Sequence, residues 1–591
     1  MHNLFTKNNF FWIVLVTAVV VFLRIYGLSQ GDTVNDEAAI AFRAIGMVDY
    51  LKSDEQTTPV EWADPVPFES CATDKPEAIC ETKALIRHNA VKNAWWLPLS
   101  FHDHPPLVFW IQHFFMRILG ERPWAFRLPS AIFGLGSILV LYGIGKILFG
   151  RRTGLLAAAI LGLTLNHVYI SRVGLQESYV IFFVLLTIYC FLKAREKDFY
   201  YLISGVALGL GLLAKYTSFI VAPILIIYAL CFERRIFRNW KLWAGGGVAL
   251  LLFSPIILYN IGLYRAVGHF DFQFSYIFGQ HPEIWQSYPG KDIGTLNQRL
   301  SDFLPRLLSS NSWLLLSFFA LAVFAAARNF LKKPADVWRS YGFLIISLVA
   351  LCGLILLVGP SFRFLTMLTP FLALGAGVLA DSLIRHRGKI AVFGVALGLG
   401  FELFYSINNQ LLPRAIGSEI FLASPVRAEN YRWGYAKLDD FFSAEFKGRV
   451  PAWSFTKNYG FLRKLQVESL EAARKGGATP YPILVIYDES LFDLARLWVL
   501  DRHFFYEGWP IISTADYDEL LKKQGENYFK KLGFKKIYGV FSGTQVLLNA
   551  DGQNTEATLR LKRDFAAGGA ALKIIAAPSG ATAFEIYNDE F

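Results

Sequence analysis

The chain has 591 residues, of which 54% are hydrophobic and only 18% are charged, and its formal net charge is +11. One compact core does not extend over this length, so two parts are expected. The small charged fraction excludes an ordinary soluble protein, which covers its surface with more charge. The basic excess is typical of cytoplasmic loops in a membrane protein. Because Lys and Arg stand in short clusters between apolar runs, we expect no nucleic acid as a partner.

Apolar segments with roughly the length of a membrane-spanning helix, about 17–25 residues, recur along the first two thirds of the chain. The eleven segments lie near residues 10–27, 127–149, 153–170, 177–193, 199–214, 216–232, 242–261, 313–328, 340–359, 363–381 and 389–407. No small-residue cleavage pattern follows the first one, so we expect it to remain as a span. The sequence therefore predicts a polytopic α-helical protein of the plasma (inner) membrane.

The positions of Lys and Arg orient these spans. With the N-terminus in the cytoplasm, the short inner loops carry the basic clusters 146–152, 193–197, 234–241, 328–339 and 385–389. The first outer loop, 28–104, instead has thirteen acidic residues against six basic ones. This asymmetry indicates one consistent orientation.

The segment 105–120 is apolar but short, and it contains Gln112, His113 and Arg117. A span here would reverse every later loop, so we predict an amphipathic helix on the outer surface. The long outer loops are then 28–126 and 262–312. The second of these contains polar residues that are either acceptor-binding groups or simply solvated: Tyr264, Arg265, His269, Asp271 and His281.

From about residue 410 the chain becomes polar, with strand-like runs at 482–487 (PILVIY) and 536–541 (KIYGVF) and a helix-like stretch at 513–532. We therefore predict a transmembrane domain over residues 1–409 and an extracytoplasmic α/β domain over 410–591, periplasmic or extracellular. Cys71 and Cys80 share the first outer loop, where they form either a disulfide or two free thiols.

Acidic residues follow the first span as Asn35-Asp36-Glu37. Paired acids of this kind hold a divalent metal or act as a general base. The alternative is a pair of charges in the first turn of a helix, since an apolar stretch with helical spacing follows.

A second polar cluster stands at His102-Asp103-His104, before two prolines. Two histidines beside an aspartate bind metal or move protons. The alternative is that Asp103 caps the surface helix that begins after the prolines.

Further ionisable residues lie at the outer ends of spans: Arg172, Glu177, Lys215 and Arg363. Charges at this depth are costly unless they serve a function or pair with each other. Cations here suit a phosphate group. An Arg172–Glu177 ion pair, or snorkelling of the long side chains to the interface, is the structural alternative.

The chain resembles the GT-C superfamily of lipid-linked-sugar transferases, specifically the branch related to protein O-mannosyltransferases and the lipid A aminoarabinose transferase. The resemblance is carried by NDEAAIAF (35–42), HPPLVFWIQHFF (104–115), the stretch 127–178 that ends in SRVGLQES, LLAKYTSF (212–219) and FRFLTMLTPFLALGAGVLA (362–380). It covers roughly residues 10–410 and is strong over 104–193.

The resemblance implies an inverting glycosyltransferase, a hexosyl or pentosyl transferase that uses a polyprenyl-phosphate sugar. Asp36 stands at the catalytic base of the family, and Glu37 resembles the second acid of its Asp-Glu pair. We assign substrate binding to His102, Asp103, His104, Arg172, Glu177, Lys215 and Arg363. For Arg172, Lys215 and Arg363 the resemblance implies either phosphate handling or structural support. His104 opens the His-Pro-Pro-Leu motif of the mannosyltransferase branch, where the aminoarabinose branch has Lys. Glu177 departs from the family, whose members commonly have Asp there.

A divalent metal held by Asp36, Glu37 and His104 is the one cofactor that this site suggests. The expected partners are the lipid-linked sugar donor, the bilayer and an envelope acceptor that is a lipid, a glycan or a protein. The rival function is a transporter or flippase for lipid-linked sugars. Internal repeats and charges at the midplane would favour that rival, whereas here the charges lie near the surface.

Overall fold

The computed structural model describes residues 7–47, 95–280, 294–329, 335–418, 421–430, 432–454, 460–544, 546, 548–549, 555–578 and 580–590. The predictions for Cys71, Cys80 and His281 fall outside these residues. The chain divides into two compact units. We call residues 1–29, 98–265 and 269–430 the helical unit, and residues 30–97, 266–268 and 431–591 the sheet unit.

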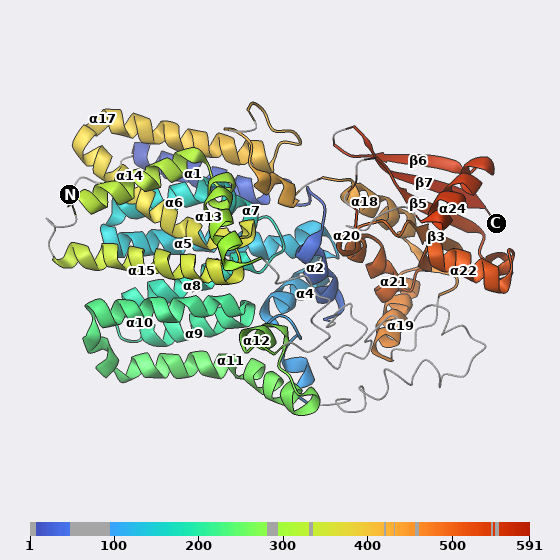
Figure 1. Cartoon of the computed structure of the whole chain (residues 1–591), viewed down its shortest axis with the longest axis horizontal. Coiled ribbons are helices and arrows are strands. Elements are labelled where there is room, and N and C mark those ends of the chain that lie inside the picture. The colour runs from blue at the N-terminus through green and yellow to red at the C-terminus, as the bar shows by residue number, and fades with distance from the viewer. Residues whose placement is uncertain are drawn as a thin grey trace. The chain divides into compact units, whose positions relative to one another are not determined.

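Helices make up the helical unit (Figure 1). The α-helices are α1 (Lys7–Ile25), α4 (Leu107–Leu119), α5 (Pro123–Phe149), α6 (Arg151–Leu163), α7 (Leu165–Ile170), α8 (Glu177–Lys193), α9 (Tyr200–Ala214), α10 (Val221–Phe232), α11 (Trp240–Val267), α12 (Phe272–Ile277), α13 (Leu296–Ser310), α14 (Trp313–Asn329), α15 (Ala335–Val358), α16 (Phe362–Leu365) and α17 (Thr369–Gln410). Short 3₁₀ turns join them: η2 (Leu97–Leu99), η3 (Tyr216–Ile220), η4 (Arg234–Arg238), η8 (Thr366–Leu368) and η9 (Pro425–Asn430).

Four helices in the described part of the chain are long and apolar enough to cross a membrane. They are Pro123–Phe149, Trp240–Ala266, Trp338–Val358 and the bent stretch Phe362–Gln410. A fifth span results if Leu296–Ser310 and Trp313–Ala327, which are separated by a bend of 116°, count as one. The chain is therefore a helical membrane protein. Helices lie at all the predicted apolar segments, but the number of crossings stays a prediction.

Two of the predicted spans differ from the observed helices in a way that the backbone explains. Extended Thr164, with ψ 128°, separates α6 from α7 where one span was expected over 153–170. Conversely, the two last predicted spans run together as α17. Gly388 interrupts the helical geometry between them with φ 59° and ψ −132°, a conformation that glycine adopts without steric cost.

Glycines bring α9 and α11 into close contact. A Cβ atom added to Gly205 would lie 2.0 Å from the carbonyl oxygen of Gly245, and one added to Gly245 would lie 2.3 Å from that of Tyr201. Only glycine permits this backbone approach, which is the usual way in which membrane helices gain packing contacts.

The sheet unit contains α2 (Asn35–Gly46) and the part of the chain after residue 430. Its later helices are α18 (Tyr435–Phe446), α19 (Gly460–Lys475), α20 (Asp493–Arg496), α21 (Arg502–Glu507), α22 (Thr514–Gln524), α23 (Tyr528–Lys531) and α24 (Glu556–Ala567), with a π-helical turn, η10 (Leu497–Asp501). Its strands are β1 (Arg449–Pro451), β2 (Thr479–Tyr481), β3 (Ile483–Tyr487), β4 (Ile511–Ser513), β5 (Lys536–Ser542), β6 (Ala571–Ala576) and β7 (Thr582–Glu590).

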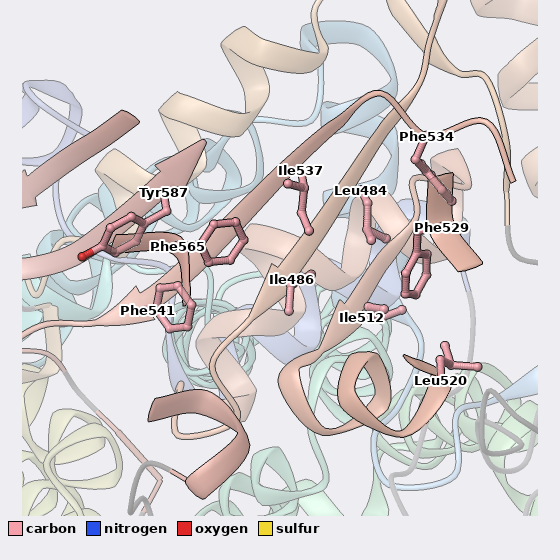
Figure 2. Packing of buried hydrophobic residues seen from close by; sticks show 10 residues of the cluster. All are labelled: Leu484, Ile486, Ile512, Leu520, Phe529, Phe534, Ile537, Phe541, Phe565 and Tyr587. Atoms are coloured by element: carbon pink, nitrogen blue, oxygen red, sulfur yellow. The ribbon is translucent and has the colours of Figure 1, made fainter. Parts of the chain in front are cut away.

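Five strands form a mixed sheet in the order β4-β3-β5-β7-β6. β3 pairs in parallel with β4 and β5, whereas β7 is antiparallel to both β5 and β6. The strands expected at 482–487 and 536–541 are thus confirmed as β3 and β5. Figure 2 shows side chains of this sheet packed with those of the covering helices, among them Ile486, Phe541 and Phe565.

The segment around α2 belongs to the sheet unit although it was assigned to the first outer loop of the transmembrane domain. Phe42 is buried and its ring lies 5.6 Å from that of Phe505 and 5.2 Å from that of Tyr506. The contacts of α2 therefore run to residues more than 400 positions later in the chain. The predicted boundary at 409/410 stays a prediction.

Candidate functional site

A buried carboxylate and two cations meet in the helical unit. Glu177 is the first residue of α8, and its side chain is only 3% exposed. The Lys215 ammonium donates to the Glu177 Oε1 atom at 2.6 Å. The Arg363 Nε atom lies 4.0 Å from the same oxygen. The structure thus brings together three of the predicted site residues, and their formal charges sum to one positive charge.

The backbone explains how Lys215 reaches this position. It stands between α9 and η3 in an extended conformation, with φ −165° and ψ 141°, so the helical path is interrupted at this residue. Both cations also lie over the ring of Phe364, which follows Arg363 in the short helix α16. The distances to the ring centroid are 5.0 Å for the Lys215 ammonium and 4.9 Å for the Arg363 guanidinium carbon. This aromatic face stabilises the two neighbouring cations.

Arg172 has backbone partners in the structure. Its guanidinium is 1% exposed and donates to the carbonyl oxygens of Leu23 at 2.7 Å, Tyr26 at 2.8 Å and Gly27 at 2.9 Å. These carbonyls belong to the end of α1 and the turn that follows it, where the last helical carbonyls have no partner within the helix. The contacts assign Arg172 a supporting role, and its predicted role in donor binding stays a prediction.

The histidine cluster is also buried in the helical unit. The Nδ1 atom of His104 lies 2.8 Å from an Asp103 carboxylate oxygen, and both side chains are at least four-fifths buried. Pro106 occupies the N-cap of α4 with no side-chain cap hydrogen bond, so the alternative that Asp103 caps this helix is wrong. The carbonyl oxygen of His102 accepts from the Phe272 N–H at 3.0 Å, which joins this segment to the start of α12.

A polar network around Asp271 lies next to this segment. Asp271 is fully buried and N-caps α12 by accepting from the Phe274 N–H at 2.8 Å. The Tyr216 hydroxyl donates to it at 2.6 Å and the Asn260 amide at 3.0 Å. Burial raises the pKa of Asp271, and the nearby Asp103 carboxylate adds to the rise.

Sequence reasoning placed Asp271 in an outer loop but did not find its partners. Tyr216 follows Lys215 directly, so one interruption between α9 and η3 serves both the cation cluster and this network. In the sequence, the position of Tyr216 next to Lys215 was the one sign of this network, because Asn260 lies inside an apolar run.

Asp36 and Glu37 lie in the sheet unit, in the first turn of α2. Glu37 is buried, and Asp36 is partly exposed. Asn35 directly before them has φ 55°, a left-handed conformation that asparagine tolerates better than most residues. The turn position agrees with the helix N-terminal alternative and leaves the catalytic role a prediction.

A divalent metal finds no ready set of ligands in the described residues. Within them, no group of three or more His, Cys, Asp or Glu side chains is arranged to hold a metal ion. The metal ligands predicted at Asp36, Glu37 and His104 stay a prediction. We therefore assign no reaction step to a metal.

The central part of the helical unit matches a known protein family. Residues 103–259 match the family described as dolichyl-phosphate-mannose-protein mannosyltransferase. The matched segment contains five of the predicted site residues: Asp103, His104, Arg172, Glu177 and Lys215. The match covers neither the segment of Asp36 nor the later part of the sheet unit.

Similar proteins include YycA of Bacillus subtilis, which is 31% identical over 169 residues, or 28% of this chain and 24% of the relative. The undecaprenyl phosphate-alpha-4-amino-4-deoxy-L-arabinose arabinosyl transferase of Erwinia tasmaniensis is 23% identical over 38% of this chain and 39% of its own length. The chain thus spans between a quarter and two fifths of these relatives.

Among solved structures, ArnT from Cupriavidus metallidurans in the apo state is 13% identical, with 98% of both chains covered and a TM-score of 0.47. The lipopolysaccharide core galacturonosyltransferase RgtB of Rhizobium johnstonii is 30% identical over 27% of this chain and 34% of its own length. The matched segment and the named relatives make the central part of the helical unit similar in sequence to glycosyltransferases.

Proposed function

We propose that the protein transfers a sugar from a polyprenyl-phosphate donor to a hydroxyl acceptor on the outer face of the membrane. The observation that carries this proposal is the cluster of Lys215, Arg363 and Glu177, in which two partly exposed cations share one buried carboxylate. The two cations suit an anionic phosphate, which Lys and Arg bind through charge-assisted hydrogen bonds. The match over residues 103–259 supports the same class of donor.

The proposed reaction is a single inverting displacement. The Asp36 carboxylate takes the proton of the acceptor hydroxyl while that oxygen forms a bond to the anomeric carbon of the sugar. The bond from this carbon to the phosphate oxygen breaks, and its electron pair leaves with the polyprenyl phosphate. Lys215 and Arg363 stabilise the charge that develops on the leaving group, while His104 with Asp103 contacts the donor.

We infer the finer topology from the distribution of basic residues. The chain has about eleven crossings, its N-terminus is cytoplasmic, and the domain over 410–591 is periplasmic or extracellular. The acceptor is a component of the cell envelope, as the name of the lipopolysaccharide core galacturonosyltransferase indicates for that relative. The donor is an undecaprenyl-type phosphate sugar by the same analogy.

The test uses the purified full-length protein in detergent with a panel of radiolabelled polyprenyl-phosphate sugars, and it follows release of free polyprenyl phosphate. Asp36→Asn removes the proposed base without changing the shape of the side chain. We expect near-complete loss of turnover with donor binding retained. Asp564→Asn is the matched control, because Asp564 is exposed on α24 of the sheet unit.

Turnover that survives in Asp36→Asn at the level of the unchanged protein would refute the proposed base. If no donor in the panel is cleaved although one binds, an assay of lipid-linked-sugar flipping in liposomes decides for the transporter. Flipping that persists in Asp36→Asn would favour that rival function.

A further inference from the structure

The segment that carries the proposed base is fastened within the sheet unit by a buried aspartate. Asp32 is 1% exposed. Its Oδ2 atom accepts from the backbone N–H groups of Trp433 at 2.5 Å and Gly434 at 3.0 Å, and its Oδ1 atom accepts from that of Ala436 at 2.8 Å. These donors surround the first turn of α18, so the carboxylate occupies the positive end of this helix.

The electrostatics of Asp32 are those of an ionised anchor at neutral pH. Burial raises the pKa of Asp32 to about 6, while the hydrogen bonds from the start of α18 oppose the rise. The carboxyl is thus mostly ionised at pH 7 and presents both oxygens as acceptors. A neighbouring contact continues the attachment, because the Arg432 guanidinium donates to the Gln30 side-chain oxygen at 2.6 Å.

A second anchor holds the other side of the segment. The Tyr506 hydroxyl donates to the carbonyl oxygen of Phe42 at 2.8 Å, inside α2. The Phe42 ring lies edge-on against that of Phe505 at 5.6 Å. Both partners belong to α21, whereas the Asp32 anchor is on α18. Two separate helices of the sheet unit therefore hold the chain on either side of residue 36.

We propose that the sheet unit positions the catalytic base, and that Asp32 and Tyr506 are positioning residues for Asp36. Asp36 stands four residues after Asp32 and six before Phe42, at a helix start that includes the left-handed Asn35. A helix start in this conformation keeps its geometry when the chain is fixed on both sides. This inference rests on the proposed role of Asp36, and it assigns the later part of the chain a direct share in turnover.

Two variants test the proposal in the full-length protein. Asp32→Asn keeps the shape of the side chain but replaces one carboxylate oxygen, which accepts, with an amide nitrogen, which donates. At least one backbone N–H group at the start of α18 then loses its acceptor. Tyr506→Phe removes only the hydroxyl that bonds to Phe42. For Asp32→Asn we expect kcat for donor cleavage to fall by on the order of 10²-fold, as misplacement of a catalytic group by about 1 Å does, while KM for the donor changes little. Tyr506→Phe lowers kcat by a smaller factor.

The matched control is Ser513→Ala, which removes the side-chain N-cap of α22 in the same unit. It lowers the thermal midpoint without a selective loss of kcat. Hydrogen exchange provides a readout that is independent of activity. Backbone amides of residues 35–46 are expected to exchange faster in Asp32→Asn and to keep their rate in Ser513→Ala.

The outcomes separate the two proposals. Unchanged kcat and unchanged exchange in Asp32→Asn, together with an inactive Asp36→Asn, would overturn the positioning role and leave the proposed function standing. Faster exchange over 35–46 combined with a selective loss of kcat supports it. Full turnover in Asp36→Asn would instead refute the proposed base, and the positioning role with it.

Discussion

Removal of the Lys215 charge tests the site in the helical unit most sharply. Lys215→Met keeps the length and apolar stem of the side chain but leaves the Glu177 carboxylate, 3% exposed, without its 2.6 Å partner. Removal of one partner of a buried ion pair typically costs about 3–5 kcal/mol. Arg363 remains at 4.0 Å and is itself 30% exposed. We therefore expect a lower cost, about 2–3 kcal/mol of unfolding free energy.

The double variant Glu177→Gln/Lys215→Met separates stability from function. It removes both charges, so its stability is expected to return to within about 1 kcal/mol of the unchanged protein. Donor cleavage stays impaired, because the ammonium proposed to contact the phosphate is still missing. The assay combines detergent-micelle unfolding titrations of the four proteins in the cycle with release of polyprenyl phosphate.

The control and the contradicting results are clear for this cycle. Lys241→Met breaks a surface pair, 3.7 Å from Asp198 with both side chains at least a third exposed, and is expected to change stability by less than about 1 kcal/mol. A double variant no more stable than Lys215→Met would show that the two buried charges are not coupled. A double variant with restored donor cleavage would refute the phosphate role of Lys215.

Gly245→Ala is expected to lower the thermal midpoint, since its Cβ would lie 2.3 Å from a carbonyl oxygen on α9. The control Gly246→Ala meets no atom within 4 Å, so its stability should be unchanged or rise by up to about 1 kcal/mol from helix propensity. Equal thermal midpoints of the two variants would contradict the close packing of α9 and α11. Tyr216→Phe removes the hydroxyl that donates to buried Asp271 and should cost about 1.5–3 kcal/mol in detergent unfolding titrations, with an unchanged value counting against the network. Because burial raises the pKa of Asp32 from 3.8 to about 6, the stability that comes from protonation of this carboxyl is fully present below pH 4 and is lost as the pH rises through 6. Thermal midpoints of Asp32→Asn should therefore vary less between pH 4 and 6 than those of the unchanged protein, and parallel curves would argue against this titration.

The local pattern of the sequence was sufficient for the helices and strands but not for their long-range partners. The apolar run at 177–193 coincides with α8, and the alternating run at 536–541 with β5, because periodicity and composition act over neighbouring residues. The sequence also singled out Glu177, Lys215 and Arg363. Their meeting at one carboxylate needed the structure, since 38 residues separate the first two.

Other parts of the site followed from contacts that no spacing rule contains. The Asp32 anchor joins positions 401 to 404 residues apart, and the acidic composition of its loop gave it no distinction from its neighbours. Donor binding by Arg172 was predicted because this charged residue lies at the end of an apolar span. Its burial there is equally explained by the carbonyl groups that it binds at the end of α1. A buried charge indicates a partner without saying which partner it is.

The Asp32 and Tyr506 contacts also set the order of events during synthesis. Residues 30–46 leave the ribosome more than 380 residues before the chain that holds them, and the Tyr506–Phe42 bond closes a loop of 464 residues. Pairings of such long separation form late, since the chain between them must be ordered first. Residues 30–46 therefore reach their final position only after translation has passed Tyr506, so a nascent chain that has already inserted its helices has not yet ordered the segment of the proposed base.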